Sequence, residues 1–431
     1  EAPSPILGRF DEEDISLPSE VLITVMKKHQ RYFALQSNGE LLPYFIAVRN
    51  GGTEGEGLVR QGYEAVLGAR FADATYFYRQ DSERSLDEFL PRLATLAFQE
   101  RLGSMLDKTC RLEALASELG PLLGITEDET PLLQRAAHLC KADLATQMVI
   151  EFTSLQGVMG RIYALQQDQD EGVADAILEH YLPRHAGDAV PTSRLGLALG
   201  IADRLDSILG LLAVGLEPSG SADPHALRRT ASGLVQNLIQ RQMRLDLRKA
   251  LDLVAEHLPV KADEATQKRA IEFIAQRLRA YLREQGLRYD VIDAALAERG
   301  HDPYWAAKTA PGLQSWVERS DWMDILNTYA RCKRIVRDVE TRYEVNREAF
   351  EEDASRALYG EYKVMIAMLE ITQESEIKSL MLALQSLVPT INRFFDDVLV
   401  MAEDRVLRKN RLALVQCIAE LPNGIVDLSR L

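Results

Sequence analysis

Residues 135–143 read Arg-Ala-Ala-His-Leu-Cys-Lys-Ala-Asp, which places His138 and Asp143 within a segment of helical pattern. The pattern extends far beyond this stretch, because apolar residues recur with a period of about 3.6 from residue 89 onward. Such a period is typical of amphipathic helices that turn one face toward a core. We therefore expect a mainly α-helical chain.

Residues that typically begin or end helices divide the helical region. Thr-Pro at residues 130–131 predicts the N-cap and first position of one helix. Asp-Pro at residues 223–224 predicts the same for a long helix that runs to residue 257. Breaks rich in Gly, Pro and polar residues lie at residues 217–223, 300–303 and 311–312. These breaks, with the change of pattern near residue 89, predict boundaries near residues 90, 220 and 310.

The first ninety residues follow a different pattern. Short segments rich in β-branched and aromatic residues lie at residues 21–26, 32–35 and 42–48. Turn chemistry at residues 37–39 and 50–52 separates them, which predicts a small β-sheet. The glycine-rich residues 51–57 lack the Gly-Lys-Ser/Thr ending of a phosphate-binding loop, and no helical pattern follows them at once. We expect a plain loop there.

Length and composition bound the class of protein. The 431 residues fit two to four domains, and a composition of 46% apolar and 27% charged residues is typical of globular proteins. The net charge of −15 argues against non-specific electrostatic binding of the whole chain to nucleic acid or to an anionic membrane. Any contact with nucleic acid must therefore be local.

The cysteines and the lengths of the apolar runs bear on the cellular compartment and on membrane insertion. The four cysteines form no Cys-x-x-Cys pair, so we expect neither a disulfide framework nor a thiolate zinc site, and a reducing cytoplasm fits best. The longest membrane-like stretch, residues 207–216, is shorter than the about 20 residues of a spanning helix. The first residue is Glu and no targeting pattern follows it, so we expect part of a longer protein.

Local charge is more informative than the total. Residues 150–224 carry 4 basic and 11 acidic side chains, whereas residues 225–288 carry 13 basic and 7 acidic ones. A helix expected over residues 329–347 has an apolar stripe made of Tyr329, Cys332, Val336, Val339 and Tyr343. The other faces of that helix carry Arg331, Lys333, Arg334 and Arg337. We predict a basic ridge, with a merely solvated helix face as the alternative.

A second basic group follows near the C-terminus. Arg405, Arg408 and Lys409 share a helical face at i, i+3 and i+4, and Arg411 lies close by. The alternative is intramolecular pairing with the acidic residues Asp396, Asp397, Glu403 and Asp404. We expect Phe394 and Phe395 to be core residues, because both fall within an apolar run.

Histidine and aspartate recur within the helical region, at His138, Asp143, His180, His185 and Asp203. The pattern resembles HD-superfamily metal phosphohydrolases, in which imidazole and carboxylate hold a divalent metal beside an attacking water. Here the His-Asp doublet reads Ala142-Asp143, which removes one imidazole ligand. We expect an inherited fold without a metal, whose polar groups pair in the interior. A phosphohydrolase that uses His138, Asp143, His180 and Asp203 is the alternative.

Other catalytic patterns are missing from the sequence. It has no Gly-x-Ser-x-Gly elbow, no His-Glu-x-x-His, no Rossmann glycine fingerprint and no Walker loop. We therefore expect no catalytic residues in this chain.

A series of motifs in fixed order carries a family resemblance. Three of them read Met-Lys-Lys-His-Gln-Arg-Tyr-Phe at 26–33, Leu-Gln-Gly-Val-Met-Gly at 155–160 and Ala-Arg-Cys-Lys-Arg-Ile at 330–335. Others lie at residues 41–46, 69–74, 98–104, 141–143, 179–183, 202–206, 223–229, 394–396 and 401–412. They resemble the beta subunit of bacterial tetrameric glycyl-tRNA synthetase along essentially the whole chain. One departure is Gly-Tyr-Glu-Ala at 62–65, where the family usually has Gly-Asn-Glu-Arg.

The resemblance implies a subunit that binds tRNA(Gly), while a separate alpha subunit holds the site for glycine, ATP and Mg²⁺. It implies a small sheet domain over residues 1–90, a degenerate HD-like helical domain over residues 91–290, and a helical anticodon-binding bundle over residues 291–431. This chain itself is expected to hold no cofactor. A helical interaction scaffold without RNA is a further alternative.

The resemblance also suggests which basic residues meet the RNA, because Arg and Lys grip phosphates. The anticodon side is expected at Arg331, Lys333, Arg334, Arg337, Arg405, Arg408, Lys409 and Arg411. The acceptor side is expected at His29, Arg31, Arg241, Arg244, Arg248 and Lys249. The alternative for His29 and Arg31 is packing within the sheet domain, and for the others it is solvation of a long helix.

Overall fold

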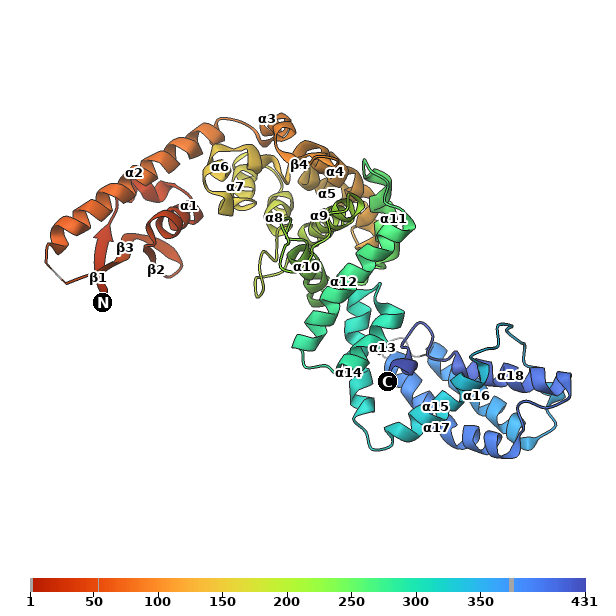
Figure 1. Cartoon of the computed structure of the whole chain (residues 1–431). Coiled ribbons are helices and arrows are strands. Elements are labelled where there is room, and N and C mark those ends of the chain that lie inside the picture. Colours follow the sequence, from red (N-terminus) through yellow and green to blue (C-terminus); the bar gives the residue numbers. More distant parts are fainter. Residues whose placement is uncertain (1–2, 53, 372–375) are drawn as a thin grey trace. The chain divides into compact units, whose positions relative to one another are not determined.

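The computed structural model describes residues 3–52, 54–371 and 376–431, apart from the side chains of residues 29 and 368–371. The chain forms two compact units (Figure 1). Unit 1 comprises Glu1–Asn237 and Ala250–Gln267, and unit 2 comprises Leu238–Lys249 and Lys268–Leu431. Helices dominate both units, as the sequence predicted, and the small sheet lies in unit 1. The division into three domains remains a prediction.

Unit 1 begins with a three-stranded antiparallel sheet in the order β1-β3-β2. The strands are β1 (Pro3–Arg9), β2 (Phe33–Ser37) and β3 (Glu40–Asn50). The strands predicted at residues 32–35 and 42–48 are confirmed. The predicted turn between them is also confirmed, because Asn38 and Gly39 both have positive φ angles, which Asn and Gly tolerate best.

Two local predictions in this region were wrong. Residues 21–26, expected as a strand, form helix α1 (Ser19–Val25), which continues into a π-helix, η2 (Met26–Gln30). Val21, Leu22 and Val25 are fully buried at helical spacing, so tertiary packing overrides their β propensity. The glycine-rich loop is followed directly by the long helix α2 (Glu56–Ser82), not by further loop.

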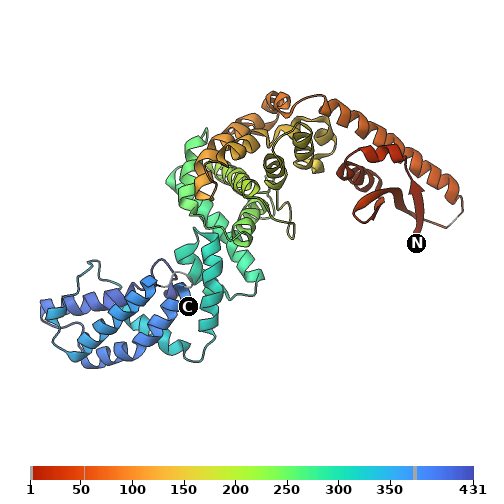
Figure 2. The ribbon, with the colours of Figure 1, turned by 180° about the vertical axis from the view of Figure 1, so that it is seen from behind.

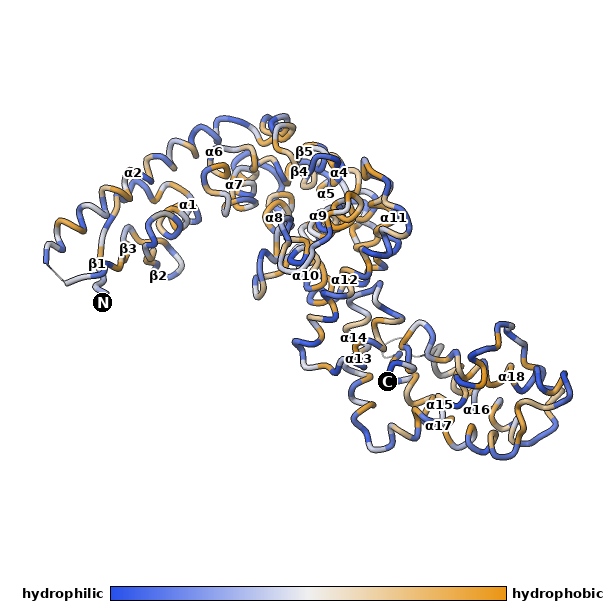
Figure 3. The backbone as a smooth tube through the Cα atoms, viewed as in Figure 1, coloured by the Kyte–Doolittle hydropathy of each residue, from blue (hydrophilic) through white to orange (hydrophobic). Residues whose placement is uncertain are grey.

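Strand β1 was not predicted, because prolines and a glycine depress its strand signal. It pairs with β3 over its whole length, with Ile6 opposite Ala47 and Gly8 opposite Phe45. Ile6, Phe45 and Ala47 are buried on the face of the sheet next to α2, which packs against β1. Hydrophobic and hydrophilic residues alternate around α2 (Figure 3), as expected for a helix with one face against a core.

The rest of unit 1 is a helical assembly around α9 (Arg194–Ala213), most of whose side chains are buried. Helices α4 (Met105–Leu122), α5 (Thr130–Leu139) and α8 (Glu171–Glu179) pack directly against α9 (Figure 2). The remaining elements are α3 (Leu86–Phe89), β4 (Ala97–Gln99), β5 (Gly103–Ser104), α6 (Gln147–Glu151) and α7 (Val158–Gln166). The N-cap of α5 is Glu129, one residue before the predicted Thr130.

The long helix predicted from residue 223 to residue 257 is two helices, α10 (Leu227–Gln240) and α11 (Leu247–His257). Gln242, between them, has a φ of 52°, which breaks the helical backbone. The predicted start is close to the observed one, because the Asp223 carboxylate accepts the backbone N–H of Leu227 and of Arg228. Helix α12 (Glu264–Glu284) follows.

Unit 2 ends in the helices α13 (Tyr289–Arg299), α14 (Pro303–Val317), α15 (Trp322–Val336), α16 (Asp353–Ile371), α17 (Glu376–Asp397) and α18 (Arg405–Ala419). The break predicted at residues 300–303 is confirmed. The break predicted at residues 311–312 is wrong, because both residues lie inside α14. A Cβ on Gly312 would lie 2.7 Å from Cγ2 of Ile377, so this glycine serves the close approach of α17.

No helix within the described parts of the chain is long and apolar enough to cross a lipid bilayer.

The edge strand β1 allows a direct test of the sheet. A Cβ on Gly8 would overlap the ring of Phe45, which is fully buried. We expect Gly8→Ala to lower the free energy of unfolding by about 1–3 kcal/mol, because an added methyl overpacks the contact. Urea denaturation measures the change. In the control Gly68→Ala, on an open face of α2, the methyl meets nothing within 4 Å and should not destabilise. Equal effects of both changes would contradict the packing.

Candidate functional site

A buried ion-pair network lies in the core of unit 1, where the C-terminal ends of α5 and α8 meet the middle of α9. Lys141 follows α5, His180 follows α8, and Asp203 lies within α9. The Lys141 Nζ lies 2.8 Å from His180 Nε2 and 3.0 Å from Asp203 Oδ2. The Lys141 side chain is only 4% exposed. One ammonium group therefore joins an imidazole to a carboxylate in the interior.

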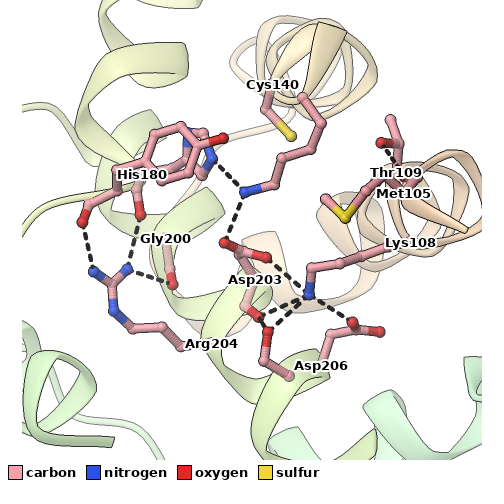
Figure 4. A network of polar contacts seen from close by, with 12 residues as sticks. Met105, Lys108, Thr109, Cys140, His180, Gly200, Asp203, Arg204 and Asp206 are labelled. Carbon is pink, nitrogen blue, oxygen red and sulfur yellow. Dashed lines mark hydrogen bonds and ion pairs between the residues drawn. The ribbon is translucent and has the colours of Figure 1, made fainter. Parts of the chain in front are cut away.

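A second lysine completes the network from α4. The Lys108 Nζ lies 2.9 Å from Asp203 Oδ1 and 2.7 Å from Asp206 Oδ2. Arg111, also on α4, donates through Nε to Asp206 Oδ1 at 2.6 Å. Figure 4 shows Lys108, Asp203 and Asp206 pointing toward one another. We call Lys108, Lys141, His180, Asp203 and Asp206 the buried centre.

The protonation states of the buried centre follow from its geometry. The His180 Nδ1 lies 2.7 Å from the carbonyl oxygen of Ile177, to which it donates, so Nε2 is left to accept from Lys141. Burial and the Lys141 charge hold the pKa of His180 well below its usual value, so the imidazole is neutral. Burial opposes ionisation of Asp203, but the charges of Lys108 and Lys141 bring its pKa well below the usual value.

The buried centre does not fit a divalent metal. Its potential ligand atoms, His180 Nε2 and both carboxylate oxygens of Asp203, are already taken by ammonium groups. A cation brought among them would meet the positive charges of Lys108 and Lys141. Among the residues that the structure describes, no group of three or more His, Cys, Asp or Glu side chains is placed to hold a metal ion.

Asp143 is buried but has a structural role. Its Oδ2 accepts the backbone N–H of Gly157 at 2.6 Å and of Gly160 at 3.2 Å, which fixes the start of α7. Burial raises the pKa of Asp143 to about 6, although both hydrogen bonds oppose that rise. A Cβ at Gly160 would collide with Ile177, so the backbone can reach this carboxylate only at a residue without a side chain.

Two of the histidines expected at an HD-like site lie elsewhere. His138 is half-exposed, with Nδ1 2.9 Å from Glu113 Oε2 and Nε2 3.4 Å from Asp87 Oδ1. His185 has an exposed side chain. The set His138, Asp143, His180 and Asp203 is therefore not assembled around one point, because His138 points to the surface carboxylates of other helices. The phosphohydrolase alternative is not supported.

Sequence reasoning missed the cations of this region. Lys108, Arg111, Lys141 and Arg204 are buried, and only the histidines and acidic residues were singled out. Arg204 donates through Nη1 to the carbonyl oxygens of His180 and Gly200 (Figure 4). It also donates through Nη2 to the carbonyl oxygen of Leu182. These cations could have been found as charged residues at positions where the helical pattern calls for apolar ones. Such a residue is expected to be buried, and a buried cation needs a partner nearby.

The predicted basic ridge is shorter than expected. Helix α15 ends at Val336, so the apolar stripe continues only through Tyr329 and Cys332, which are buried. Arg334 is exposed, and Arg337 is 75% exposed beside Asp338 at 3.5 Å. Lys333 is half-buried.

Arg331 is held against the bundle. Its guanidinium lies 4.7 Å from the ring centroid of Phe395, and its Nη1 lies 3.4 Å from Asn392 Oδ1. Phe394 is buried, as predicted, whereas Phe395 is only half-buried and carries this arginine on its ring.

The basic residues of α18 divide into two groups. Arg405 and Lys409 are exposed, and Arg408 is half-buried with Nη1 3.5 Å from the carbonyl oxygen of Ala402. Arg411 is 8% exposed, forms an ion pair with Glu352 and donates to the carbonyl oxygen of Leu399 at 2.9 Å. The expectation that Arg411 faces RNA is therefore corrected, because its guanidinium is used inside the bundle.

The expected acceptor-side residues do not form one helical face. Arg244 lies between α10 and α11, 3.4 Å from Asp302 and 4.3 Å from the ring centroid of Trp305. Arg248 pairs with Asp246 at 2.7 Å. Arg241, Lys249 and Arg31 are exposed, and the side chain of His29 lies outside the described residues. The single long helix expected over residues 223–257 is interrupted between Gln240 and Leu247, and the predicted role of these residues in acceptor binding stays a prediction.

Comparison with known proteins gives a consistent result. The family profile described as "Glycyl-tRNA synthetase beta subunit" matches residues 1–297, and the profile "DALR anticodon binding domain" matches residues 325–426. The chain is 42% identical over its full length to "Glycine--tRNA ligase, chloroplastic/mitochondrial 2" of Arabidopsis thaliana. It is 40% identical to "Glycine--tRNA ligase beta subunit" of Clostridioides difficile and 39% identical to that of Moorella thermoacetica. It spans 40% of the length of the first relative and 63% of each of the other two.

The raised pKa of Asp143 predicts a pH-dependent stability. Its folded pKa of about 6 exceeds the ordinary 3.8, so between these values the native state holds a proton that the unfolded chain has released. This contribution is complete below pH 3.8 and is lost as the pH rises through 6. We expect the unfolding free energy of the wild type, minus that of Asp143→Asn, to fall by about 2 kcal/mol between pH 4 and pH 7. Urea titrations at each pH measure it, and a constant difference would contradict the assignment.

Proposed function

Because the chain belongs to the glycyl-tRNA synthetase beta-subunit family, we propose that it is the tRNA-binding part of a glycine–tRNA ligase. Its partners are then tRNA(Gly) and an alpha subunit that holds glycine, ATP and Mg²⁺. The names of its relatives support this proposal, since several are glycine–tRNA ligase beta subunits. We place the ligase in the cytoplasm, because the cysteines are free thiols, as in a reducing compartment.

The observation that carries the proposal is the exposed basic surface of the C-terminal bundle. It lies within the residues matched by the anticodon-binding profile, and α15 packs directly against α18. We call Arg334, Arg337, Arg405 and Lys409 the bundle surface, with the half-buried Arg331, Lys333 and Arg408 at its border. Exposed Arg and Lys are suited to phosphates, because they release counterions when they bind.

The proposal keeps the three-domain division as its frame. Residues 1–90 and 91–290 are then the sheet domain and the degenerate HD-like domain, which serve the rest of the tRNA, and residues 291–431 serve the anticodon arm. Arg31, Arg241 and Lys249, which are exposed, remain candidates for the acceptor side. Arg244 and Arg248 also remain candidates, and they form ion pairs with Asp302 and Asp246.

The other two readings have less support. A phosphohydrolase needs a metal or another activated water, and the buried centre offers neither a free ligand set nor a free carboxylate oxygen on Asp203. A scaffold that binds no RNA does not account for the exposed cations of the bundle surface, which stand out in a chain of net charge −15.

The bundle surface predicts a salt-dependent affinity for tRNA. We expect the double variant Arg334→Ala with Arg337→Ala to bind tRNA(Gly) more weakly. The slope of log affinity against log salt should flatten by about 1.4–1.8, because each lost phosphate contact removes about 0.7–0.9 counterions. Filter binding over a salt series measures the slope. The control Arg283→Ala, an exposed arginine near the end of α12, should leave it unchanged. If the slope of the double variant is unaltered, neither residue contacts a phosphate, and their role is structural.

The division of labour predicts that this chain does not activate glycine. Glycine-dependent exchange of pyrophosphate into ATP should stay at background with the chain alone and appear when the alpha subunit is added. The physical reason is that the sequence carries no nucleotide-binding loop and no nucleophile with its base. Exchange by the chain alone would contradict the division.

A further inference from the structure

A cleft of about 630 Å³ opens in unit 1 beside the buried centre. Five segments of the sequence contribute to it: the π-helix η2, the turn before α7, the chain after α8, helix α9 and the start of α10. Two side chains of the buried centre, His180 and Asp203, also line it. Its other lining residues are Lys27, Ser154, Gln156, Tyr181, Pro183, Arg184, His185, Arg204, Ser207, Ala226, Arg229 and Thr230.

The rim of the cleft is cationic. Lys27, Arg184 and Arg229 are exposed and approach from three different segments. Arg184 has a partner in Asp188 at 3.2 Å. For Lys27 and Arg229, no acidic side chain of the described residues lies within ion-pair distance. Two cations are thus free to meet an anion, and Asp203 is the one acidic side chain among the described residues that line the cleft.

The floor of the cleft adds to the positive potential. Lys108, Arg111, Lys141 and Arg204 are buried behind it, and the carboxylates that face them are Asp203 and Asp206. Arg204 donates to backbone carbonyl oxygens, so no carboxylate cancels its charge directly. Positive charges remain in excess even when Asp143 is ionised. Charge buried behind a concave surface is screened less by salt than charge in open solvent, so the cleft attracts anions.

The chemistry of the lining favours a phosphate over a nucleotide base. Tyr181 is the one Tyr, Phe or Trp among the described lining residues, and its ring is already engaged. The His180 ring centroid lies 3.8 Å from it, and the Lys141 Nζ lies 4.2 Å from its centroid. Among the neutral lining residues, Ser154 and Gln156 carry hydrogen-bond donors, whereas the Thr230 hydroxyl already donates to the carbonyl oxygen of Ala226. A base would find no free aromatic face, whereas a phosphodiester would find cations and donors.

We propose that this cleft binds a phosphodiester group of the tRNA backbone at a point outside the anticodon arm, with Lys27 and Arg229 as its direct contacts. The proposal rests on the proposed function, because it assumes that the chain binds tRNA. It adds a site in unit 1 to the bundle surface in unit 2. The buried centre itself has no net charge, because Lys108 and Lys141 balance Asp203 and Asp206. Arg111 and Arg204 supply the positive excess behind the cleft, without a metal that could cleave the bound RNA.

The test uses the whole chain with two RNAs, full-length tRNA(Gly) and its isolated anticodon stem-loop. We expect Lys27→Ala with Arg229→Ala to weaken binding of the full tRNA roughly tenfold at about 0.1 M salt and to flatten its salt slope by about 1.4–1.8. Binding of the stem-loop should be unchanged. The control Arg101→Ala removes an exposed arginine between β4 and β5, outside the cleft, and should alter neither RNA. Both replaced residues are exposed, so urea unfolding should match that of the wild type.

The outcomes separate the cleft from the proposed function. If the wild-type chain binds neither RNA, the proposed function fails. If it binds both and the double variant is indistinguishable from Arg101→Ala, the cleft proposal is overturned while tRNA binding stands. Inorganic phosphate and AMP, titrated as competitors, form the last arm. Competition by AMP far below the concentration needed for phosphate would mean a nucleotide site and would also overturn the proposal.

Discussion

The ammonium group of Lys141, held between the imidazole of His180 and the carboxylate of Asp203, is the constraint on which unit 1 depends. It keeps His180 neutral and Asp203 ionised, and it leaves no ligand atom of this pair for a metal. Removing one partner would leave a charge buried without compensation, at a cost of several kcal/mol. Internal ion pairing therefore occupies the polar atoms of His180 and Asp203 in the core of unit 1.

The proposed function requires an acidic chain to hold RNA at local cationic sites. Arg111 and Arg204 add positive charge behind the cleft of unit 1, and the C-terminal bundle exposes the four cations of the bundle surface. Acidic side chains dominate other segments, such as residues 150–224, so RNA contacts are expected where basic residues gather. Local charge thus matters more for binding than the net charge of the molecule.

Much of the fold follows from apolar periodicity, because helices and the strands at residues 32–35 and 42–48 bury one regular face. The failures are equally physical. Residues 21–26 have β-branched side chains but pack as a helix, and Gly312 serves a close helix contact in the middle of α14. Neither fact is local, because each depends on a neighbour supplied by distant sequence.

The candidate site was predictable in part. His180 and Asp203 were singled out and do meet, but the residue between them was not, because periodicity does not say which lysine turns inward. Arg411 shows the reverse error. It shares a basic segment with Arg405 and Lys409, yet its partner Glu352 lies 59 residues away and draws it into the bundle. The sequence shows where charge is, and the tertiary structure determines which charge is free.

The central claim is that lysine ammonium groups stand in the buried centre where a hydrolase would hold its metal. Elemental analysis of the purified chain, after dialysis with Mn²⁺ and then buffer, tests it most directly when paired with a phosphodiester hydrolysis assay on the same sample. The account predicts substoichiometric metal and no turnover. One tightly held divalent ion per chain, with hydrolysis that depends on His180 and Asp203, would contradict it.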